Sequence, residues 1–425
     1  MDRKRLEICF RDAVIAMILN VRDFETDDPS FDAAGAALAA AADGDVVYFP
    51  AGQYTAPDGG WQLTKSLQIR GDGPGQVGLP GGTVLMAPTR NSPVFVIVPP
   101  STNTYVRDLQ LVSATSGSSA NGVGIRCIGT ATAGAANLRL GGLLVSGFDR
   151  NGVELHGYSD TAGLIDSVLV LDCEFVGCGR AGLSLKHAAA AHVSNCVFRD
   201  NGYGGLSSEA CSIAVYGSTF DGNCTSVSGA PEANLTFLNC QSAKAEACRF
   251  LGFNAGTIRK ACLIDGGMAS VGSCFFDSGN AAGSASGIVV TRSTPGQPMA
   301  GPVTILGNHF ANTAALINVD SNVTNCLILG QYDEGAGSVI IPQPDNNGLV
   351  GAPHIVRAEQ FETRMTGLIL PSGATDPAVA YNGMLTYNTY LKAVRVFIGR
   401  DPNNPAVNPG AWKSIKFIPK PPPQP

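Results

Sequence analysis

The chain has 425 residues, of which 44% are hydrophobic and 15% charged, and its formal net charge at pH 7 is −6. This acidic balance argues against nucleic acid or an anionic membrane surface as the partner, because both are negatively charged. No stretch approaches the roughly 18 consecutive apolar residues of a membrane-spanning helix, so we expect no membrane insertion. Residues 1–19 are basic and then briefly apolar, without a small-x-small cleavage site, so we expect no cleaved signal peptide.

Residues 21–54 contain the first clear secondary-structure signals. The Ala-rich run 33–42 predicts a helix, because alanine is the best helix former and aspartates before it suit a helix N-terminus. Residues 21–24 and 46–54 predict strands, the second leading into a turn at Pro50-Ala51-Gly52. The sequence therefore predicts a short helical segment followed by β-structure.

This order of elements is similar to a known family. The shared features are a strand ending in Asp23-Phe24, the paired Asp27-Asp28, a helix, and Val47-Tyr48-Phe49-Pro50-Ala51-Gly52-Gln53-Tyr54. Together they resemble the beginning of pectate-lyase-like right-handed parallel β-helices, which include the polysaccharide-binding or polysaccharide-degrading spikes of tailed phages. Here the usual Gly-rich segment between Asp-Phe and the paired Asp is shortened to Glu25-Thr26, which affects the local loop and not the fold. The resemblance implies a virion spike that acts as a homotrimer.

Glycines after the next strand have the spacing of a dinucleotide-binding loop. Gly73, Gly75 and Gly78 match that spacing, but Pro80 follows where a helix should begin. We therefore predict a turn of the β-structure and expect no cofactor.

The segment from Leu143 to Phe310 repeats one motif, a small or polar residue, any residue, and a large apolar residue. The aromatic positions are Phe175, Phe198, Phe220, Phe250 and Phe276, with Phe310 in a looser copy. A period of roughly 20–50 residues with short strands in each copy is typical of a solenoid. Because a single repeat cannot bury its own apolar face, identical positions must stack. We predict an all-β chain whose main domain is a right-handed parallel β-helix, with these phenylalanines in its interior.

Cysteines recur in the same repeat register. Cys173, Cys196, Cys248 and Cys274 begin four of the copies, which predicts that they fill an interior column as free thiols. Stacked cysteines have a poor geometry for disulfides, and no Cys or His pair has metal-ligand spacing, so we expect no metal. Free buried thiols suit folding in a reducing cytoplasm, here that of the host.

The pattern changes after residue 331. We predict an N-terminal segment and helical cap at 1–45, the β-helix at 46–330, a linker or cap at 331–351, a small β-module at 352–418 and a Pro-rich tail at 419–425. The module resembles those that close phage fibres and spikes, which implies a role in assembly or receptor contact.

Candidate site residues follow from strand alternation. Aligning the repeats on Gly122, Gly152, Gly182 and Gly205 places Arg126, His156, Lys186 and Glu209 in one outward column, with Glu154, Ser184 and Ser207 beside it. We predict Arg126, His156, Lys186, Ser184 and Ser207 as a polysaccharide-binding surface. Glu154 and Glu209 form the candidate catalytic pair, expected near 10 Å apart, at the upper edge for an inverting hydrolase.

Three functional classes remain open at this point. The first is a virion spike or fibre protein that binds a bacterial surface polysaccharide and assembles with other virion proteins, with or without cleaving the glycan. The second is a secreted, extracellular polysaccharide lyase or glycoside hydrolase. The third is a purely structural fibre. If the chain is an enzyme, it is a polysaccharide lyase, which needs a base and a cation near a uronate, or a glycoside hydrolase, which needs two carboxyl groups.

Overall fold

The computed structural model describes residues 16–28, 30–79, 81–114, 121–225, 233–253, 260–279, 285–291, 302–313, 315–320, 323, 326–329, 331–333, 338–340, 355–357, 372–373, 385–388, 393–398 and 411–414.

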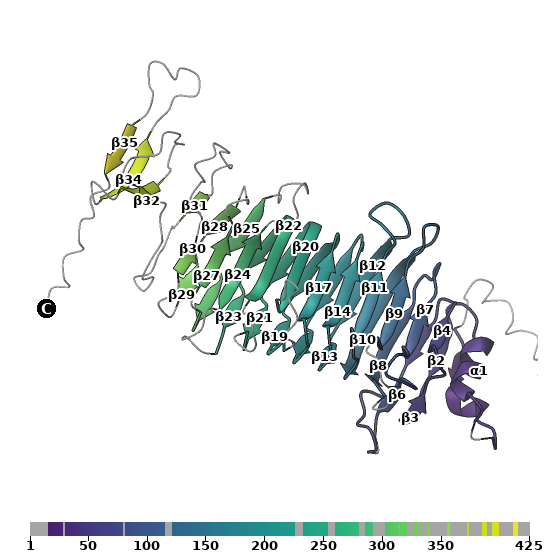
Figure 1. Ribbon diagram of the computed structural model, residues 1–425. Helices are drawn as coiled ribbons and strands as arrows, with labels where there is room; N and C mark the ends of the chain where they lie inside the picture. Colours follow the sequence, from purple (N-terminus) through teal and green to yellow (C-terminus); the bar gives the residue numbers. More distant parts are fainter. Residues whose placement is uncertain are drawn as a thin grey trace, which may run out of the picture.

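Within them, 31 strands form one continuous parallel ladder that winds through three faces, which makes the chain a parallel β-helix (Figure 1). Each coil contributes a short strand to each face, and strands of successive coils pair in parallel. The expected all-β solenoid is confirmed.

The strands of face 1 are β4 (Trp61–Leu63), β7 (Phe95–Ile97), β9 (Ile125–Ile128), β11 (Val153–His156), β14 (Ala181–Lys186), β17 (Gly204–Glu209), β24 (Ser286–Thr291), β27 (Ala315–Val319) and β30 (Ser338–Ile340). Those of face 2 are β1 (Ile18–Asn20), β2 (Val46–Tyr48), β5 (Gln68–Arg70), β12 (Ile165–Leu171), β15 (Ala191–Ser194), β18 (Ser212–Tyr216), β25 (Val303–Leu306), β28 (Cys326–Leu329) and β31 (Ile355–Arg357). Those of face 3 are β3 (Gly52–Thr55), β6 (Thr83–Met86), β13 (Glu174–Val176), β16 (Val197–Arg199), β19 (Thr219–Asp221), β21 (Arg249–Leu251), β23 (Phe275–Asp277), β26 (His309–Ala311) and β29 (Tyr332–Asp333).

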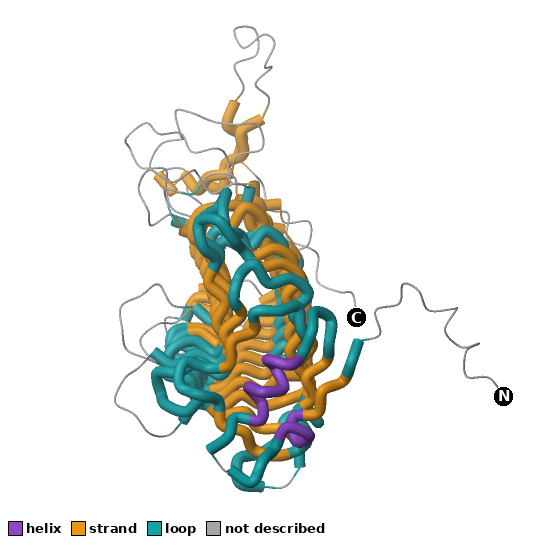
Figure 2. The backbone as a smooth tube through the Cα atoms, turned by 90° about the vertical axis from the view of Figure 1, so that its right-hand side faces the viewer, coloured by secondary structure: helices purple, strands orange, loops and turns teal. Residues whose placement is uncertain are grey.

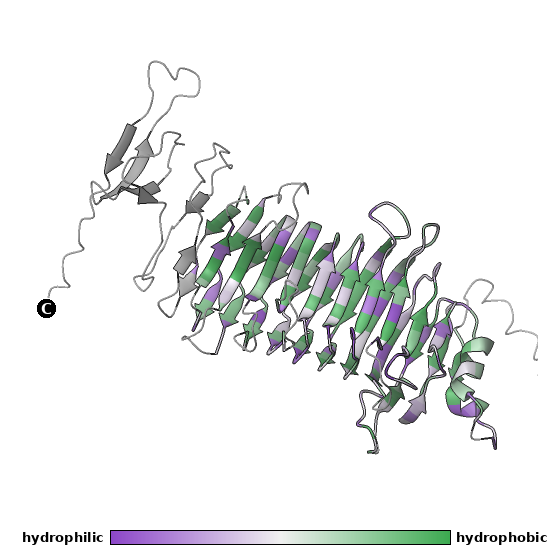
Figure 3. Ribbon diagram, viewed as in Figure 1, coloured by the Kyte–Doolittle hydropathy of each residue, from purple (hydrophilic) through white to green (hydrophobic). Residues whose placement is uncertain are grey.

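Four long strands turn a corner between faces. β8 (Tyr105–Val112) and β10 (Ala135–Ser146) run from face 2 to face 3, whereas β20 (Leu235–Glu246) and β22 (Lys260–Gly272) run from face 1 to face 2. Polar and apolar residues alternate along the strands, as the bands in Figure 3 show. Inward residues fill the interior of the coils, and outward residues form the three outer surfaces.

The predicted phenylalanine ladder is confirmed and is one coil longer than the five clear copies. Phe175, Phe198, Phe220, Phe250, Phe276 and Phe310 are all fully buried. Consecutive rings stack with centroids 4.7–5.0 Å apart and nearly parallel planes. The four repeat-register cysteines are also buried, and the eleven cysteines in the described residues are all free thiols. Cys9 lies outside the described residues.

A ladder of buried amides holds the corner after face 3. Asn201 Nδ2 donates to the carbonyl of Phe175 at 3.1 Å and to Asn223 Oδ1 at 2.8 Å. Asn223 Nδ2 in turn donates to the carbonyl of Phe198 at 2.9 Å and to Asn234 Oδ1 at 2.8 Å. Asn201, Asn223 and Asn234 therefore form a continuous ladder of side-chain amides across neighbouring coils.

Helix α1 (Ala33–Ala40) closes the N-terminal end of the stack (Figures 1 and 2). Asp32 caps it by accepting a hydrogen bond from the Gly35 backbone at 2.8 Å, and the same carboxylate accepts the Trp61 indole N–H at 3.0 Å. Ala37 and Leu38 pack into the core. The predicted helix is confirmed, but residues 21–24, expected as a strand, form a 3-10 helix (η2, Val21–Phe24) because Asn20 caps their turn.

The last described residues form a separate four-stranded sheet. Its strands are β32 (Ser372–Gly373), β33 (Leu385–Asn388), β34 (Ala393–Ile398) and β35 (Ala411–Ser414). They fall inside the expected 352–418 module, and the expected tail at 419–425 lies outside the described residues. The ladder of the β-helix extends on both sides of the expected 46–330, from β1 to β31, while the division into domains stays a prediction.

Candidate functional site

The structure corrects the register on which the predicted outward column was built. Arg126 pairs with Glu154, and the partner of His156 on that coil is Ile128. The glycine equivalent to Gly152 is therefore Gly124, not Gly122. Both lie against the backbone of the next coil, since a Cβ on Gly124 would meet the Gly152 carbonyl oxygen at 2.6 Å. A Cβ on Gly122 would also meet a backbone oxygen, that of Arg90, so the strand register and not the tight packing identifies Gly124 as the repeat position.

Glu154 lies on face 1 but is only 1% exposed. Its Oε1 accepts a hydrogen bond from Asn151 Nδ2 at 2.7 Å and lies 2.8 Å from Arg150 Nε, and its Oε2 lies 3.2 Å from Arg126 Nε. A carboxylate enclosed by two guanidinium groups and an amide has little freedom to transfer protons with a bound substrate. Its catalytic role stays a prediction, and the geometry favours a structural one.

The other predicted residues on face 1 are close neighbours and largely paired. His156 Nε2 lies 2.8 Å from Ser184 Oγ, and Lys186 Nζ donates to Glu209 Oε1 at 2.8 Å. Burial is the main cause that lowers the pKa of His156 below its ordinary value. Ser207, half-buried, follows Ser184 in its column. Arg126, Glu154, His156, Ser184, Lys186, Ser207 and Glu209 thus share one surface, which we call the face-1 patch.

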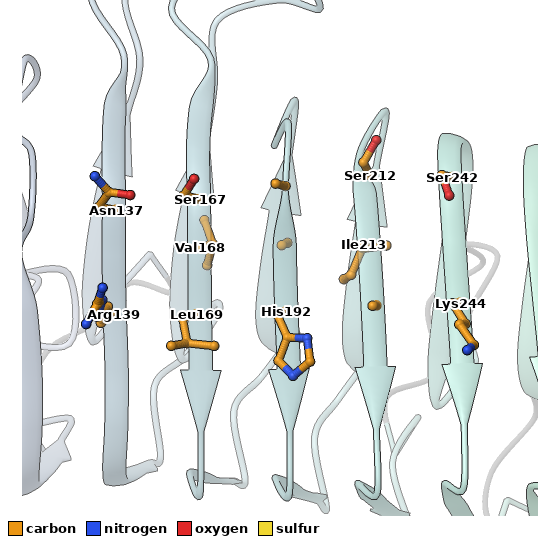
Figure 4. A pocket seen from close by; sticks show the side chains of 13 residues that line it. Asn137, Arg139, Ser167, Val168, Leu169, His192, Ser212, Ile213, Ser242 and Lys244 are labelled. Carbon is orange, nitrogen blue, oxygen red and sulfur yellow. The ribbon is translucent and has the colours of Figure 1, made fainter.

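A shallow groove of about 560 Å³ crosses face 2, on strands that the predicted site did not include. Two parallel rows of side chains line it (Figure 4). The upper row carries small polar groups on Asn137, Ser167, Ser212 and Ser242, and the lower row begins with Arg139 and ends with Lys244. Its lining residues come from β10, β12, β15, β18 and β20 and the turns between them, so the groove runs along the solenoid axis.

The lower row is a single register column. Parallel pairing links Arg139 to Leu169, Leu169 to His192, His192 to Ala214, and Ala214 to Lys244. Each of these residues stands four positions before the residue that heads the next face-3 strand motif, for example His192 before Cys196. That constant offset is the sequence signal that could have located the groove, had face 2 been aligned as face 1 was.

The nitrogen-bearing residues of this row differ in how they are engaged. Arg139 is exposed, and its guanidinium has no hydrogen-bond or ion-pair partner among the described residues. The His192 ring lies 5.1 Å from the Tyr216 ring, and Lys244 Nζ lies 5.3 Å from that ring and 2.5 Å from Glu246 Oε2. No acidic residue is among the described residues that line the groove. The described lining of the groove therefore contains hydrogen-bond donors but no carboxylate.

In the described part of the chain, no group of three or more His, Cys, Asp or Glu side chains could hold a metal ion. Within the same residues, no helix is long and apolar enough to cross a membrane.

Comparison with known proteins supports the fold. Residues 123–332 match the family described as "Right handed beta helix region". No curated protein matches the sequence.

Several solved structures share the fold at low sequence identity. DFA-IIIase from Arthrobacter chlorophenolicus A6, without its lid and in complex with GF2, superposes with a TM-score of 0.54 at 13% identity over 80% of this chain and 98% of its own. The full-length tailspike protein 2 from an Escherichia coli O157:H7 bacteriophage superposes with a TM-score of 0.57 at 12% identity, over 91% of this chain and 54% of its own. The enzymatically active domain of bacteriophage CBA120 tailspike protein 2 gives a TM-score of 0.56 at 13% identity, over 91% and 60%.

Proposed function

We propose that this chain is a phage or phage-like virion spike or fibre protein that binds a bacterial surface polysaccharide along the face-2 groove. The proposal starts from the match of residues 123–332 to the right-handed β-helix family. The likeness to a bacteriophage tailspike over 91% of this chain supports the choice of a virion protein. The alternative is a secreted β-helix lyase or hydrolase, which the DFA-IIIase likeness leaves open.

The groove is the observation that carries the proposal. It extends across five neighbouring strands along the axis, so a linear polymer can occupy successive coils with equivalent contacts. Its upper row supplies small hydroxyl and amide groups, which pair with sugar hydroxyls. Its lower row supplies the unpaired guanidinium of Arg139 and the imidazole of His192 beside Tyr216. Aligned polar groups over a flat floor suit an extended glycan better than a compact small molecule.

Binding without cleavage is what the groove supports best. Glycoside hydrolysis needs two carboxyl groups about 5–10 Å apart around the scissile bond. None of the described groove residues is acidic. If the chain does cleave its glycan, Glu154 and Glu209 of the face-1 patch stay the proposed pair, although Glu154 is buried between Arg126 and Arg150. Incubation with glycan followed by a reducing-end assay and absorbance of unsaturated products tests for either reaction.

Two matched triple variants locate the binding surface. Affinity for a panel of purified capsular polysaccharides and lipopolysaccharide O-chains is measured for the wild type, for R139A/H192A/K244A in the groove and for H156A/K186A/E209A in the face-1 patch. We expect at least a 10-fold loss for the groove variant and less than a 2-fold change for the other. The reverse result would move the site to the face-1 patch, and unchanged binding by both would refute glycan binding by either surface.

We also propose a homotrimer that folds in the host cytoplasm and joins other virion proteins. The small four-stranded sheet of β32 to β35 supports self-association, because so short a module buries little core by itself. Sedimentation equilibrium of the full chain should give three times the chain mass. A stable monomer would contradict this part of the proposal, whereas a truncation at Gly348 that stays trimeric would exclude a role for the C-terminal module.

A further inference from the structure

Resting on the proposed function, we propose that the groove recognises an acidic polysaccharide in which a charged sugar alternates with an uncharged one. The inference is based on the lower row of the groove. Its five members alternate between nitrogen-bearing and apolar side chains on successive coils, in the order Arg139, Leu169, His192, Ala214 and Lys244.

The distance between successive nitrogen-bearing side chains in the row indicates the repeat length of the ligand that fits it. Adjacent parallel strands are roughly 4.8 Å apart, so nitrogen-bearing side chains recur about every 10 Å, on every second coil. That interval is comparable to the length of a disaccharide unit in an extended polysaccharide. A chain with one anionic group per disaccharide can therefore place a carboxylate near Arg139, His192 and Lys244 in turn. A chain with an anionic group on every sugar cannot do so without placing others between them.

The positions between the nitrogen-bearing side chains disfavour a carboxylate. Leu169 and Ala214 have no side-chain donor, and their backbone N–H groups belong to the parallel ladder. A carboxylate held above them would lose water without gaining a hydrogen bond, which is costly. The C–H face of an uncharged sugar ring has no such cost there, and its hydroxyls can reach Ser167 and Ser212 in the upper row.

The two ends of the row differ in how readily their charged groups can bind a ligand carboxylate. Arg139 is unpaired among the described residues, and a guanidinium binds a carboxylate with two parallel hydrogen bonds. Lys244 already lies 2.5 Å from Glu246, so a ligand must compete with that carboxylate. We therefore expect Arg139 to contribute more to recognition of the anionic group than Lys244.

Three oligosaccharide probes of equal sugar number test this inference. Hyaluronate carries a carboxylate on every second sugar, polygalacturonate on every sugar and dextran on none. Dissociation constants are measured by calorimetry at low salt for the wild type, R139Q and K244Q. R249Q is the control, because Arg249 is an exposed residue of face 3. We expect hyaluronate to bind at least 3-fold tighter than polygalacturonate and at least 10-fold tighter than dextran. R139Q should weaken hyaluronate binding by about 5- to 20-fold, and K244Q by less.

The outcomes separate this inference from the proposed function. The inference of an alternating anionic ligand would be overturned if polygalacturonate bound as tightly as hyaluronate or more tightly, or if hyaluronate showed no preference over dextran. It would also be overturned if no probe bound, or if R139Q and R249Q had equal effects. If a polysaccharide from the bacterial panel lost binding to the groove triple variant but bound R139Q as tightly as the wild type, that result would preserve the proposed function and refute only the inference. Binding that is insensitive to the groove triple variant would refute the proposed function itself.

Discussion

The guanidinium of Arg126 and the carboxylate of Glu154 face each other across adjacent coils, with Nε and Oε2 3.2 Å apart. Arg150 approaches the same carboxylate from within its own coil, and Asn151 completes the set. Glu154 is thus the buried centre of a polar cluster, in which two partly exposed guanidinium groups offset a charge that would otherwise be costly to bury.

We predict that E154Q lowers the free energy of unfolding by about 1–3 kcal/mol, because two partly exposed guanidinium groups lose the buried carboxylate that pairs with both. E209Q is the matched control, since Glu209 forms a partly exposed pair with Lys186 that is worth about 0–1 kcal/mol. Chemical denaturation of both variants measures the difference. Equal stability of E154Q and the wild type would contradict a structural role for Glu154.

The phenylalanine ladder predicts a large packing effect. F220A removes a ring that stacks on Phe198 at 4.9 Å and on Phe250 at 5.0 Å. The cavity should destabilise the β-helix by about 3–5 kcal/mol. F220L, which retains most of the volume, should cost clearly less. If the two variants had the same unfolding midpoint, continuous stacking would not be what stabilises this column.

The amide ladder predicts a second, polar contribution. N223A leaves the carbonyl of Phe198 and the side chains of Asn201 and Asn234 without their shared partner. Each buried group left unpaired costs about 1–3 kcal/mol. N91A, at an exposed position, should change stability by less than about 0.5 kcal/mol. A loss in N223A no greater than in N91A would show that water or a rearranged turn replaces the amide.

His156 predicts a pH dependence of stability. Its folded-state pKa is lowered by burial from an ordinary value of 6.5, so the unfolded chain binds this proton more readily. The contribution is therefore fully present above pH 6.5 and is lost as the pH falls through the lowered pKa. The difference in melting temperature between the wild type and H156Q should shift against the wild type as the pH drops below 6.5. A difference that does not change with pH would contradict a lowered pKa of the half-buried His156 imidazole.

The sequence allowed the interior to be predicted better than the surface. Phe198 and Phe220 recur because stacking requires the same side chain on every coil, which leaves a visible period. Loops vary freely between coils, so the spacing of glycines misled the alignment by two residues at Gly122. The burial of Glu154 was also beyond pattern analysis, because Arg126 comes from the neighbouring coil. The groove was missed because its row mixes charged and apolar residues, and only its fixed offset from the ladder motif identifies it.

One measurement tests the central claim directly, which is that the glycan lies in the face-2 groove. A214W places an indole in the middle of the row and changes no charged or hydroxyl group. Its control is T219W, at a comparable outward position on face 3. Both variants must first have the melting temperature of the wild type. A214W should then bind the surface polysaccharide at least 10-fold more weakly than the wild type, and the affinity of T219W should lie within 2-fold of it. Wild-type affinity in A214W would contradict the account.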